Sequence, residues 1–353
     1  MSGYLARALL ASCLALASGC IHVPAQSVAV DRFDYGQALS DSWKEQTLAN
    51  VVRLRYADAP AFLEVGSVIN GYSRSNTVNV NADVPLSGSD ANLASAGGSS
   101  TWSNSPTITY QPVTGDSFAK SLLRPIPPES VLQLIQSGWR VGLILNVTVS
   151  AVNGIRNPSL VSGAPQDPRF GQLTDALGRI QQAGAMGYRV EKAQDSEGVK
   201  LLLNEQERSE VRADSEIVRQ LLGLDAGVKV LDVHFGMVPK DGQELAFVTR
   251  SMLEIMLETG TGIEVPQAHR EQKRVLYPPS AADAGYLRLV RIRSGLEHPA
   301  ESYAAIKYKG YWFWIDDNDV QSKGVFTFLM MLFSMAESGH ASAPPLISIG
   351  VGH

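Results

Sequence analysis

The chain has 353 residues, with 30 Lys and Arg against 35 Asp and Glu, and a formal net charge of −5. It has no run of Lys or Arg, so it lacks the broad basic face on which nucleic-acid binding depends, and we expect no nucleic-acid partner. No segment after the N-terminus reaches the roughly 18 consecutive apolar residues of a membrane-spanning helix. The length suits about two domains of ordinary size.

The N-terminus is organised like a secretory signal. Arg7 is the only Lys, Arg, Asp or Glu among the first thirty residues, Ala8 to Ala17 are almost wholly apolar, and small residues follow. A basic start, a short apolar stretch and a small-residue cleavage site are typical of a signal peptide, and the apolar stretch is too short for a stable membrane span. We therefore expect residues 1–19 to be a signal peptide.

The cleavage region resembles the lipobox of bacterial lipoproteins, whose cysteine is acylated and becomes the first mature residue. The matching string is Ala17-Ser18-Gly19-Cys20, with Ala17 where Leu is usual. Leu10-Ala11-Ser12-Cys13 fits the box better but leaves almost no apolar stretch after Arg7, so we prefer Cys20. An ordinary cleaved signal with an incidental cysteine is the remaining alternative. Ile21 is not the Asp that usually retains lipoproteins at the inner membrane, so the resemblance implies the outer membrane.

Cysteine usage limits the chemistry of the mature chain. The two cysteines are Cys13 and Cys20. The first would leave with the signal, and the second would carry acyl chains such as palmitate. No thiol would then remain for a nucleophile, a Cys-ligated zinc or an iron–sulfur cluster.

The first half of the mature chain predicts an α+β domain. Residues 20–36 have no clear period and contain Pro24, which indicates a tether, followed by an N-terminal domain over 37–157. Helical periodicity and end signals predict helices over Ser40–Arg53 and Glu129–Gln136. Dense apolar runs predict buried strands over Phe62–Ile69 and Arg140–Val152, the latter central because both of its faces are apolar.

Residues 73–111 predict an amphipathic β-hairpin that projects from this domain. Thr77 to Val84 alternate strictly, and a second alternating stretch runs from Thr107 to Gln111. Ser87 to Ser100, rich in Ser, Gly, Ala and Asn, indicate a long loop between them. The residues expected to contact a membrane or a partner are Val78, Val80, Val84, Leu86, Ile108 and Tyr110.

The second half predicts a second α+β domain. Prolines indicate a linker over 158–168, and the C-terminal domain would follow over 169–353. Helices are predicted over Phe170–Gln182, Asp214–Leu222, Thr249–Glu258 and Ser322–Ser338. Strands are predicted over Tyr188–Lys192, Val199–Leu203, Val228–Phe235, Leu245–Val248, Leu287–Arg293, Ala304–Tyr308, Tyr311–Ile315 and Leu346–Val351. The expected fold class is therefore α+β, with two mixed α/β domains after a lipoprotein signal.

Three longer strings carry a resemblance to a family. They are Asn50 to Pro60, the Pro-Ile-Pro-Pro segment at 125–128 running on to Trp139, and Tyr311 to Asp317. Together they resemble an uncharacterised family of Gram-negative bacterial outer-membrane lipoproteins. The resemblance implies location and brings no activity, cofactor or catalytic residue.

Candidate catalytic and metal sites each have a simpler structural interpretation. The acidic turn Asp316-Asp317-Asn318-Asp319 invites a calcium site, but an EF-hand loop needs Gly and Glu where Gln321 and Thr327 stand. Asp232 and His234 share one face of a predicted strand, which suits two metal ligands but also a solvated strand face. Gly260-Thr261-Gly262 follows a helix and lacks a third glycine, so it is a helix stop rather than a nucleotide motif. We expect no catalytic, cofactor or metal residue.

Two apolar features predict core. The aromatic cluster from Tyr308 to Trp314 suits sugar or peptide stacking, but in a hairpin half of it would be buried. The helix around Val325–Met335 is apolar nearly all round and too short to span a membrane, which favours a buried helix.

The sequence favours a non-enzymatic, lipid-anchored envelope protein with a structural or assembly role. Its partners would be the membrane, through the lipid, and a homo-oligomer or another envelope protein, with no cofactor. One alternative is an oligomeric outer-membrane pore or export component in which hairpin 73–111 enters the membrane, because several subunits could close a barrel that one hairpin cannot. The other is a periplasmic hydrolase or glycan-binding protein using Trp312 or Trp314.

Overall fold

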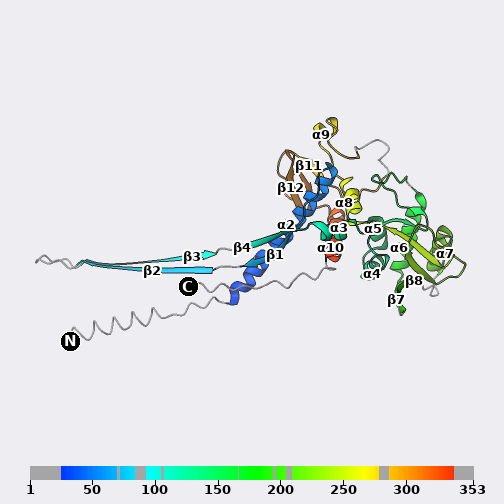
Figure 1. Cartoon of the computed structure of the whole chain (residues 1–353), viewed down its shortest axis with the longest axis horizontal. Helices are drawn as coiled ribbons and strands as arrows, with labels where there is room; N and C mark the ends of the chain where they lie inside the picture. Colours follow the sequence, from blue (N-terminus) through cyan, green and yellow to red (C-terminus); the bar gives the residue numbers. More distant parts are fainter. Residues whose placement is uncertain are drawn as a thin grey trace, which may run out of the picture. The chain divides into compact units, whose positions relative to one another are not determined.

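The computed structural model describes residues 25–69, 72–83, 93–104, 107–165, 167–193, 196–203, 209–277 and 286–337. By its internal contacts the chain divides into residues 1–46 and 47–353. Helices and several separate sheets make the fold α+β, as predicted (Figure 1). The predicted signal peptide and the predicted strand Leu346–Val351 lie outside the described residues. Among the described residues, no helix combines the length and the apolar character that crossing a membrane requires.

Helix α2 (Ala25–Arg55) is longer than the sequence predicts. Residues 25–36, which the sequence assigns to the tether over 20–36, are helical. Pro24 precedes the helix, where proline is well tolerated, and no proline interrupts it as far as Arg55. In the unit that ends at Gln46, Asp41 accepts hydrogen bonds from Gln37 and Lys44, one turn away on either side.

Within residues 47–353, the largest sheet has six strands in the order β6-β5-β10-β9-β8-β7. Their bounds are β5 (Val149–Val152), β6 (Ile155–Arg156), β7 (Met186–Ala193), β8 (Ser196–Leu203), β9 (Val230–Phe235) and β10 (Glu244–Thr249). β10 and β9 are parallel and the other neighbours are antiparallel. The predictions for β7, β8, β9 and β10 are confirmed.

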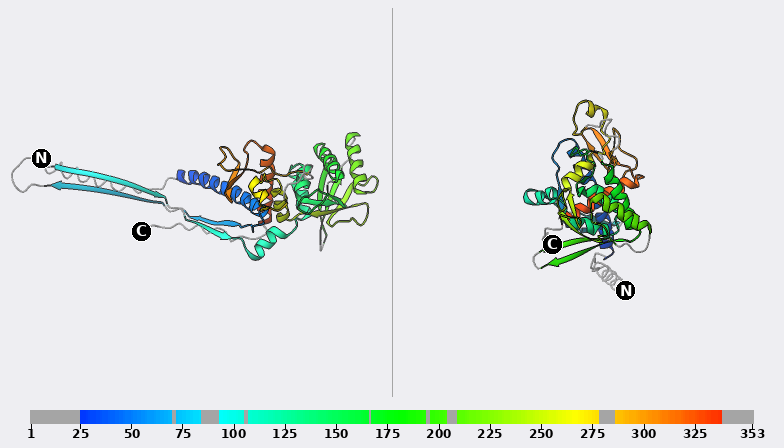
Figure 2. Two further views of the ribbon diagram at one scale, coloured as in Figure 1. Left: turned by 90° about the horizontal axis from the view of Figure 1, so that it is seen from above. Right: turned by 90° about the vertical axis from the view of Figure 1, so that its right-hand side faces the viewer.

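Four helices cover one face of this sheet: α4 (Pro128–Gln136), α5 (Val141–Thr148), α6 (Pro168–Gln182) and α7 (Ser209–Leu222). In the left view of Figure 2, green helices lie to one side of the green strands at the right-hand end. Leu245 and Phe247 of β10, two residues apart, are buried beneath them together with Leu231. Asp232, the neighbour of Leu231, is half-exposed on the other face. At β5 and β10 this second face is covered as well, since Ala151 and Ala246 are almost fully buried.

The segment expected as a linker, 158–168, does not separate two sheets. β5 and β6 precede it and β7 to β10 follow it, yet all six belong to one sheet. The join is the ladder between β10 and β5, in which Phe247 pairs with Val152 and Val248 with Ala151. The local composition of a segment does not reveal that its strand will pair with another strand about a hundred residues away.

The predicted central strand over Arg140–Val152 was wrong in its first two thirds. Val141–Thr148 form helix α5, and Val149–Val152 alone form strand β5. Val141, Ile144 and Leu145 are buried at helical spacing. The backbone N–H of Val141 donates to the side-chain Oε1 of Gln181 at 2.9 Å, which satisfies a free donor of the first turn. A dense apolar run suits a buried strand or a buried helix equally, and tertiary contacts decide here for the helix.

A second layer is built on the three-stranded antiparallel sheet β11-β13-β12. Its strands are β11 (Arg293–Gly295), β12 (Ala304–Tyr308) and β13 (Tyr311–Ile315), and the predicted hairpin β12–β13 is confirmed. Lys309 and Gly310 turn it with φ of 44° and 89°, as a tight two-residue hairpin requires. The predicted strand Leu287–Arg293 was wrong except at Arg293, where β11 begins. Just before it, Ile292 forms an isolated β-bridge to Ile263 and is not part of a strand.

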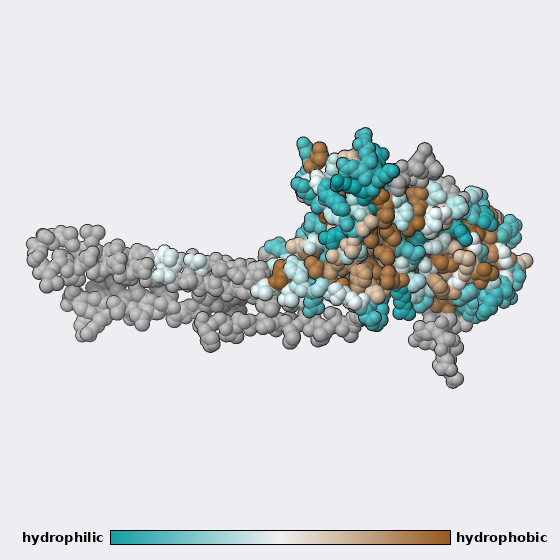
Figure 3. Space-filling model, turned by 45° about the horizontal axis from the view of Figure 1, so that its top comes forward, coloured by the Kyte–Doolittle hydropathy of each residue, from teal (hydrophilic) through white to brown (hydrophobic). Residues whose placement is uncertain are grey.

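Helices complete this layer: α3 (Gly115–Leu123), α8 (Met252–Gly260), α9 (Gln267–Glu271) and α10 (Val320–Glu337). Helix α10 is core, as predicted, with Phe326, Phe328 and Leu329 almost fully buried. The last turns of α2 are also buried, at Leu48, Val51 and Val52. On the face drawn in Figure 3, hydrophobic residues reach the surface between hydrophilic ones.

Candidate functional site

The predicted hairpin is present, and its strands are longer than the sequence predicts. β2 (Tyr72–Asp83) and β3 (Leu93–Asn104) pair antiparallel from Tyr72↔Asn104 to Asp83↔Leu93 without interruption. Residues 93–100, expected in a loop, therefore lie in a strand, and that expectation was wrong. Ser, Gly and Ala give no periodic signal, whereas backbone pairing needs no particular side chain. The hairpin forms a separate two-stranded sheet among the described residues.

The register of β2 and β3 shows which hairpin residues share a face. Directly opposed residues in an antiparallel pair lie on the same face, and successive residues alternate between faces. One face therefore carries the pairs Val78↔Gly98, Val80↔Ala96 and Ala82↔Ala94. The other carries Thr77↔Ser99, Asn79↔Gly97 and Asn81↔Ser95. The amphipathic pattern thus extends across both strands over residues 77–82 and 94–99, whereas farther along the same face the pairs Asn76↔Ser100 and Arg74↔Trp102 bring in polar residues.

A second ladder flanks the hairpin along the chain and leaves apolar residues uncovered. β1 (Leu63–Ile69) pairs antiparallel with β4 (Thr107–Pro112). Ile108 is 39% and Tyr110 55% exposed, and Leu63 and Val65 of β1 are exposed as well. The prediction of a buried strand over Phe62–Ile69 was therefore wrong in its burial, because β1 pairs with β4 alone among the described strands. Phe62, just before the strand, packs on Phe333 with ring centroids 5.5 Å apart.

The predicted contact residues fall partly within this region. Val78 and Val80 lie in β2, and Ile108 and Tyr110 lie in β4. Val84, Leu86 and the lipidation candidate Cys20 lie outside the described residues. Val78 and Val80 therefore belong to the β2–β3 sheet, whereas Ile108 and Tyr110 belong to the separate β1–β4 sheet.

The carboxylates of the acidic turn Asp316–Asp319 bond to other groups of the protein. Asp319 caps α10 by accepting from the backbone N–H and the hydroxyl of Ser322, and these bonds lower its pKa. Arg293 reaches Asp316 at 3.0 Å and Lys323 reaches Asp317 at 2.7 Å. The carboxylates stabilise a strand-to-helix turn, in agreement with the simpler interpretation of the sequence.

The pair Asp232 and His234 is likewise part of a charged strand face. Lys200 lies 3.5 Å from Asp232, and Glu244 lies 3.8 Å from His234. Among the described residues, no group of three or more His, Cys, Asp or Glu is arranged to hold a metal ion.

The aromatic cluster is divided between core and surface. Phe313 is fully buried, whereas Tyr311, Trp312 and Trp314 are half-buried. Around them, the hydroxyl of Tyr56 lies 2.7 Å from Nδ1 of the buried His269. The hydroxyl of Tyr308 donates to Asp58, which also binds Lys309 at 2.7 Å. Burial raises the pKa of both Tyr56 and Tyr308 to about 12, so these phenols stay protonated and act as fixed hydrogen-bond partners.

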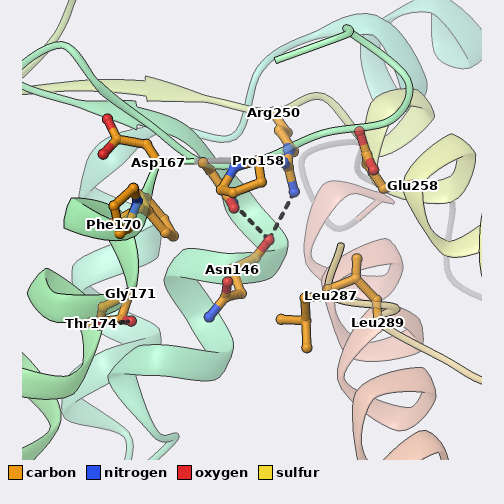
Figure 4. A pocket seen from close by; sticks show the side chains of 12 residues that line it. Asn146, Pro158, Asp167, Phe170, Gly171, Thr174, Arg250, Glu258, Leu287 and Leu289 are labelled. Carbon is orange, nitrogen blue, oxygen red and sulfur yellow. Dashed lines mark hydrogen bonds between the residues drawn. The ribbon is translucent and has the colours of Figure 1, made fainter. Parts of the chain in front are cut away.

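The structure also shows a cavity of about 540 Å³ that sequence reasoning missed. Helix α6 forms one side of it, and Leu287 and Leu289 lie on the other (Figure 4). Arg250, the residue after β10, enters between them and is 3% exposed. Its Nη1 donates to the carbonyl oxygens of Asn146 and Val147 at 2.8 and 3.3 Å. The volume is within the range of small-molecule sites.

An acidic side chain from the next helix lines the same cavity. Glu258 of α8 is 8% exposed and accepts a hydrogen bond from the hydroxyl of Ser159. Burial raises the pKa of this carboxyl, and burial also lowers the pKa of the Arg250 guanidinium. Both shifts have one cause, the removal of charged groups from water.

The local sequence explains how the two groups reach the cavity. β10 ends at Thr249, and Ser251 begins α8 with a capping box, its hydroxyl accepting from the backbone N–H of Glu254. The short connection fixes Arg250 at the end of the strand and places Glu258 two turns into the helix. A lone arginine directly after an apolar strand is the one signal in the sequence. Comparison of the chain with protein-family models, curated proteins and solved structures finds no match, so no relative supplies a role for either residue.

Proposed function

We propose that this chain is a lipid-anchored envelope protein with a structural or assembly role, carried by the β2–β3 hairpin and the β1–β4 ladder beside it. The observation that carries the proposal is the uninterrupted register of β2 and β3, which gives the hairpin two chemically distinct faces over residues 77–82 and 94–99. No catalytic residue is assigned.

The hairpin requires a partner for two physical reasons. A two-stranded sheet alone is marginally stable in water. Each of its strands also has one edge without a strand neighbour among the described residues, and such edges favour pairing with another chain. The exposed Ile108 and Tyr110 add apolar surface next to it in the chain. A second copy of this chain or another envelope protein would cover both the unpaired strand edges and this apolar surface.

The anchor is tested by changing the two cysteines separately. We expect Cys20→Ala to release the protein from membranes, because the lipid would be attached there, and Cys13→Ala to leave it membrane-bound. The measurement is fractionation of cells that express each variant, with separation of inner and outer membranes. Release by Cys13→Ala alone would show that the cleavage site is the earlier box.

The role of the hairpin is tested by matched variants on its two faces. Val78→Ser with Val80→Ser removes apolar groups from one face, and Asn79→Ser with Asn81→Ser makes changes of similar size on the other. We expect the first pair to lower the mass of the purified complex in detergent, measured by light scattering, and the second to leave it unchanged. A short Gly/Ser link in place of residues 73–103 should abolish assembly and leave a folded remainder. If the deletion variant failed to fold, the hairpin would instead be part of the core.

A second candidate function, an oligomeric outer-membrane pore component, is favoured by the length of the strands. β2 and β3 have 12 residues each, and a tilted membrane strand needs about 9–11. An open edge is not tolerated in lipid, so several subunits would have to close the barrel. Purified protein should then form rings and conduct ions in planar bilayers, and the deletion of 73–103 should do neither. Assembly without conductance would leave the structural role alone.

A further inference from the structure

The cavity at Arg250 holds two buried groups of opposite formal charge that do not pair with each other. Arg250 and Glu258 both line it and their charges attract each other, but no direct salt bridge joins them within the described part of the chain. Apart from the bonds to Asn146 and Val147, the Arg250 guanidinium makes no hydrogen bond to a described residue, so Nε and Nη2 remain as donors. Glu258 keeps its hydrogen bond from Ser159, so the remaining donors of Arg250 are the buried polar groups that gain most from a ligand.

The other polar side chains of the wall form hydrogen bonds or ion pairs within the protein, among them Asn146, whose amide donates to the carbonyl of Gly142 at 2.6 Å. Asp167 pairs with Arg169 at 2.7 Å, and that bond holds the pKa of the carboxyl below its usual value. The side-chain amide of Asn157 donates to the carbonyls of Val149 and Asn146 at 2.7 and 3.0 Å. The hydroxyl of Thr174 donates to the carbonyl of Gly171 at 2.9 Å. Ionic recognition therefore falls to Arg250 and Glu258, because Asp167, the other charged side chain of the wall, has Arg169 as its ionic partner.

The shape and charge of the cavity select the ligand. Its anionic group would pair with Arg250, because a guanidinium presents paired N–H donors that match a carboxylate. A dianionic phosphate is disfavoured by Glu258 and Asp167 in the same wall. An ammonium group would instead pair with Glu258. Between them, Phe170, Leu287 and Leu289 offer apolar contacts.

We infer that this cavity binds a small zwitterionic amino acid or short peptide, its carboxylate on Arg250, its ammonium on Glu258 and its apolar side chain against Phe170 and Leu289. This inference concerns a site separate from the hairpin and does not depend on the proposed assembly role.

The test is calorimetric titration of the full-length chain in detergent with four probes: leucine, Leu-Leu, N-acetyl-Leu-Leu and Leu-Leu amide. We expect leucine or Leu-Leu to bind at micromolar to millimolar concentration. Blocking the ammonium should weaken binding by about tenfold or more, and blocking the carboxylate by more, because a missing ionic partner leaves a buried group unpaired. Absence of binding by both free probes would overturn the inference, as would equal binding of the amide.

Variants locate the binding without disturbing the charged pair. A Cβ at Gly171 meets nothing within 4 Å, and Gly171 lines the cavity, so Gly171→Leu should fill it and weaken binding by about tenfold or more. Gly178, two turns later on α6, is equally open and is not among the lining residues, so Gly178→Leu is the matched control and should bind as the unchanged chain does. Arg250→Gln should abolish binding, with its unfolding midpoint measured to show that it folds. Unchanged affinity in Gly171→Leu would place the ligand elsewhere and refute the assignment.

Discussion

Replacing Phe328 by alanine should lower the free energy of unfolding by about 3–5 kcal/mol, the usual loss for a large aromatic side chain removed from a core. Phe328 of α10 is 0% exposed, and its ring lies 4.9 Å from that of Trp139, between ring centroids. The truncation would leave a cavity next to Trp139 that the surrounding helices cannot fill. Urea unfolding followed by circular dichroism measures the loss.

Met331 provides the control within the same helix. It is 46% exposed, so Met331→Ala should change the midpoint far less, within the range of surface substitutions at about 0.5 kcal/mol. Equal effects of the two variants would mean that α10 is not the core helix described above but a surface that a partner covers.

Replacing Gly262 by alanine should cost about 3 kcal/mol or more, at the upper end of the range for overpacking. A Cβ at this position would lie far inside 3.0 Å of the carbonyl oxygen of Val290, a backbone atom that cannot rotate away. The two segments are held together there, since the N–H of Ile292 donates to the carbonyl of Gly262 at 3.1 Å and the N–H of Glu264 donates to that of Ile292 at 2.8 Å. Thermal unfolding of the purified variant measures the effect.

Gly324, inside α10, is the matched glycine. A Cβ there meets nothing within 4 Å, so Gly324→Ala should raise stability by up to about 1 kcal/mol through helix propensity. If Gly262→Ala were as stable as Gly324→Ala, the close approach between Gly262 and Val290 would be absent in solution.

Elements with a strong local period were predictable from the sequence. The hairpin β12–β13 was found with its bounds, because segments rich in aromatic residues and Ile flank a Lys-Gly turn. Helices α4, α6 and α10 were found within two residues at each end, and α10 was recognised as core from its apolar circumference. These elements are determined by neighbouring residues, which a single sequence contains.

The candidate sites show where that information ends. The alternation of β2 identified half of the hairpin, but the pairing of the Ser/Gly/Ala stretch with it depends on backbone hydrogen bonds. The cavity depends on residues from 146 to 289 that have no shared motif, so Arg250 and Glu258 could not be paired in advance.

The sequence by itself determined the α+β class, the period of most helices and strands, and the amphipathic character of β2. The tertiary structure alone decided that Val141–Thr148 form a helix, because the cap of its first turn is Gln181, forty residues away. It also decided that strands on both sides of 158–168 share one sheet, through the pairing of β10 with β5. Local propensity describes what a segment prefers in isolation. Burial and long-range hydrogen bonds, which are absent until the chain has folded, select among those preferences.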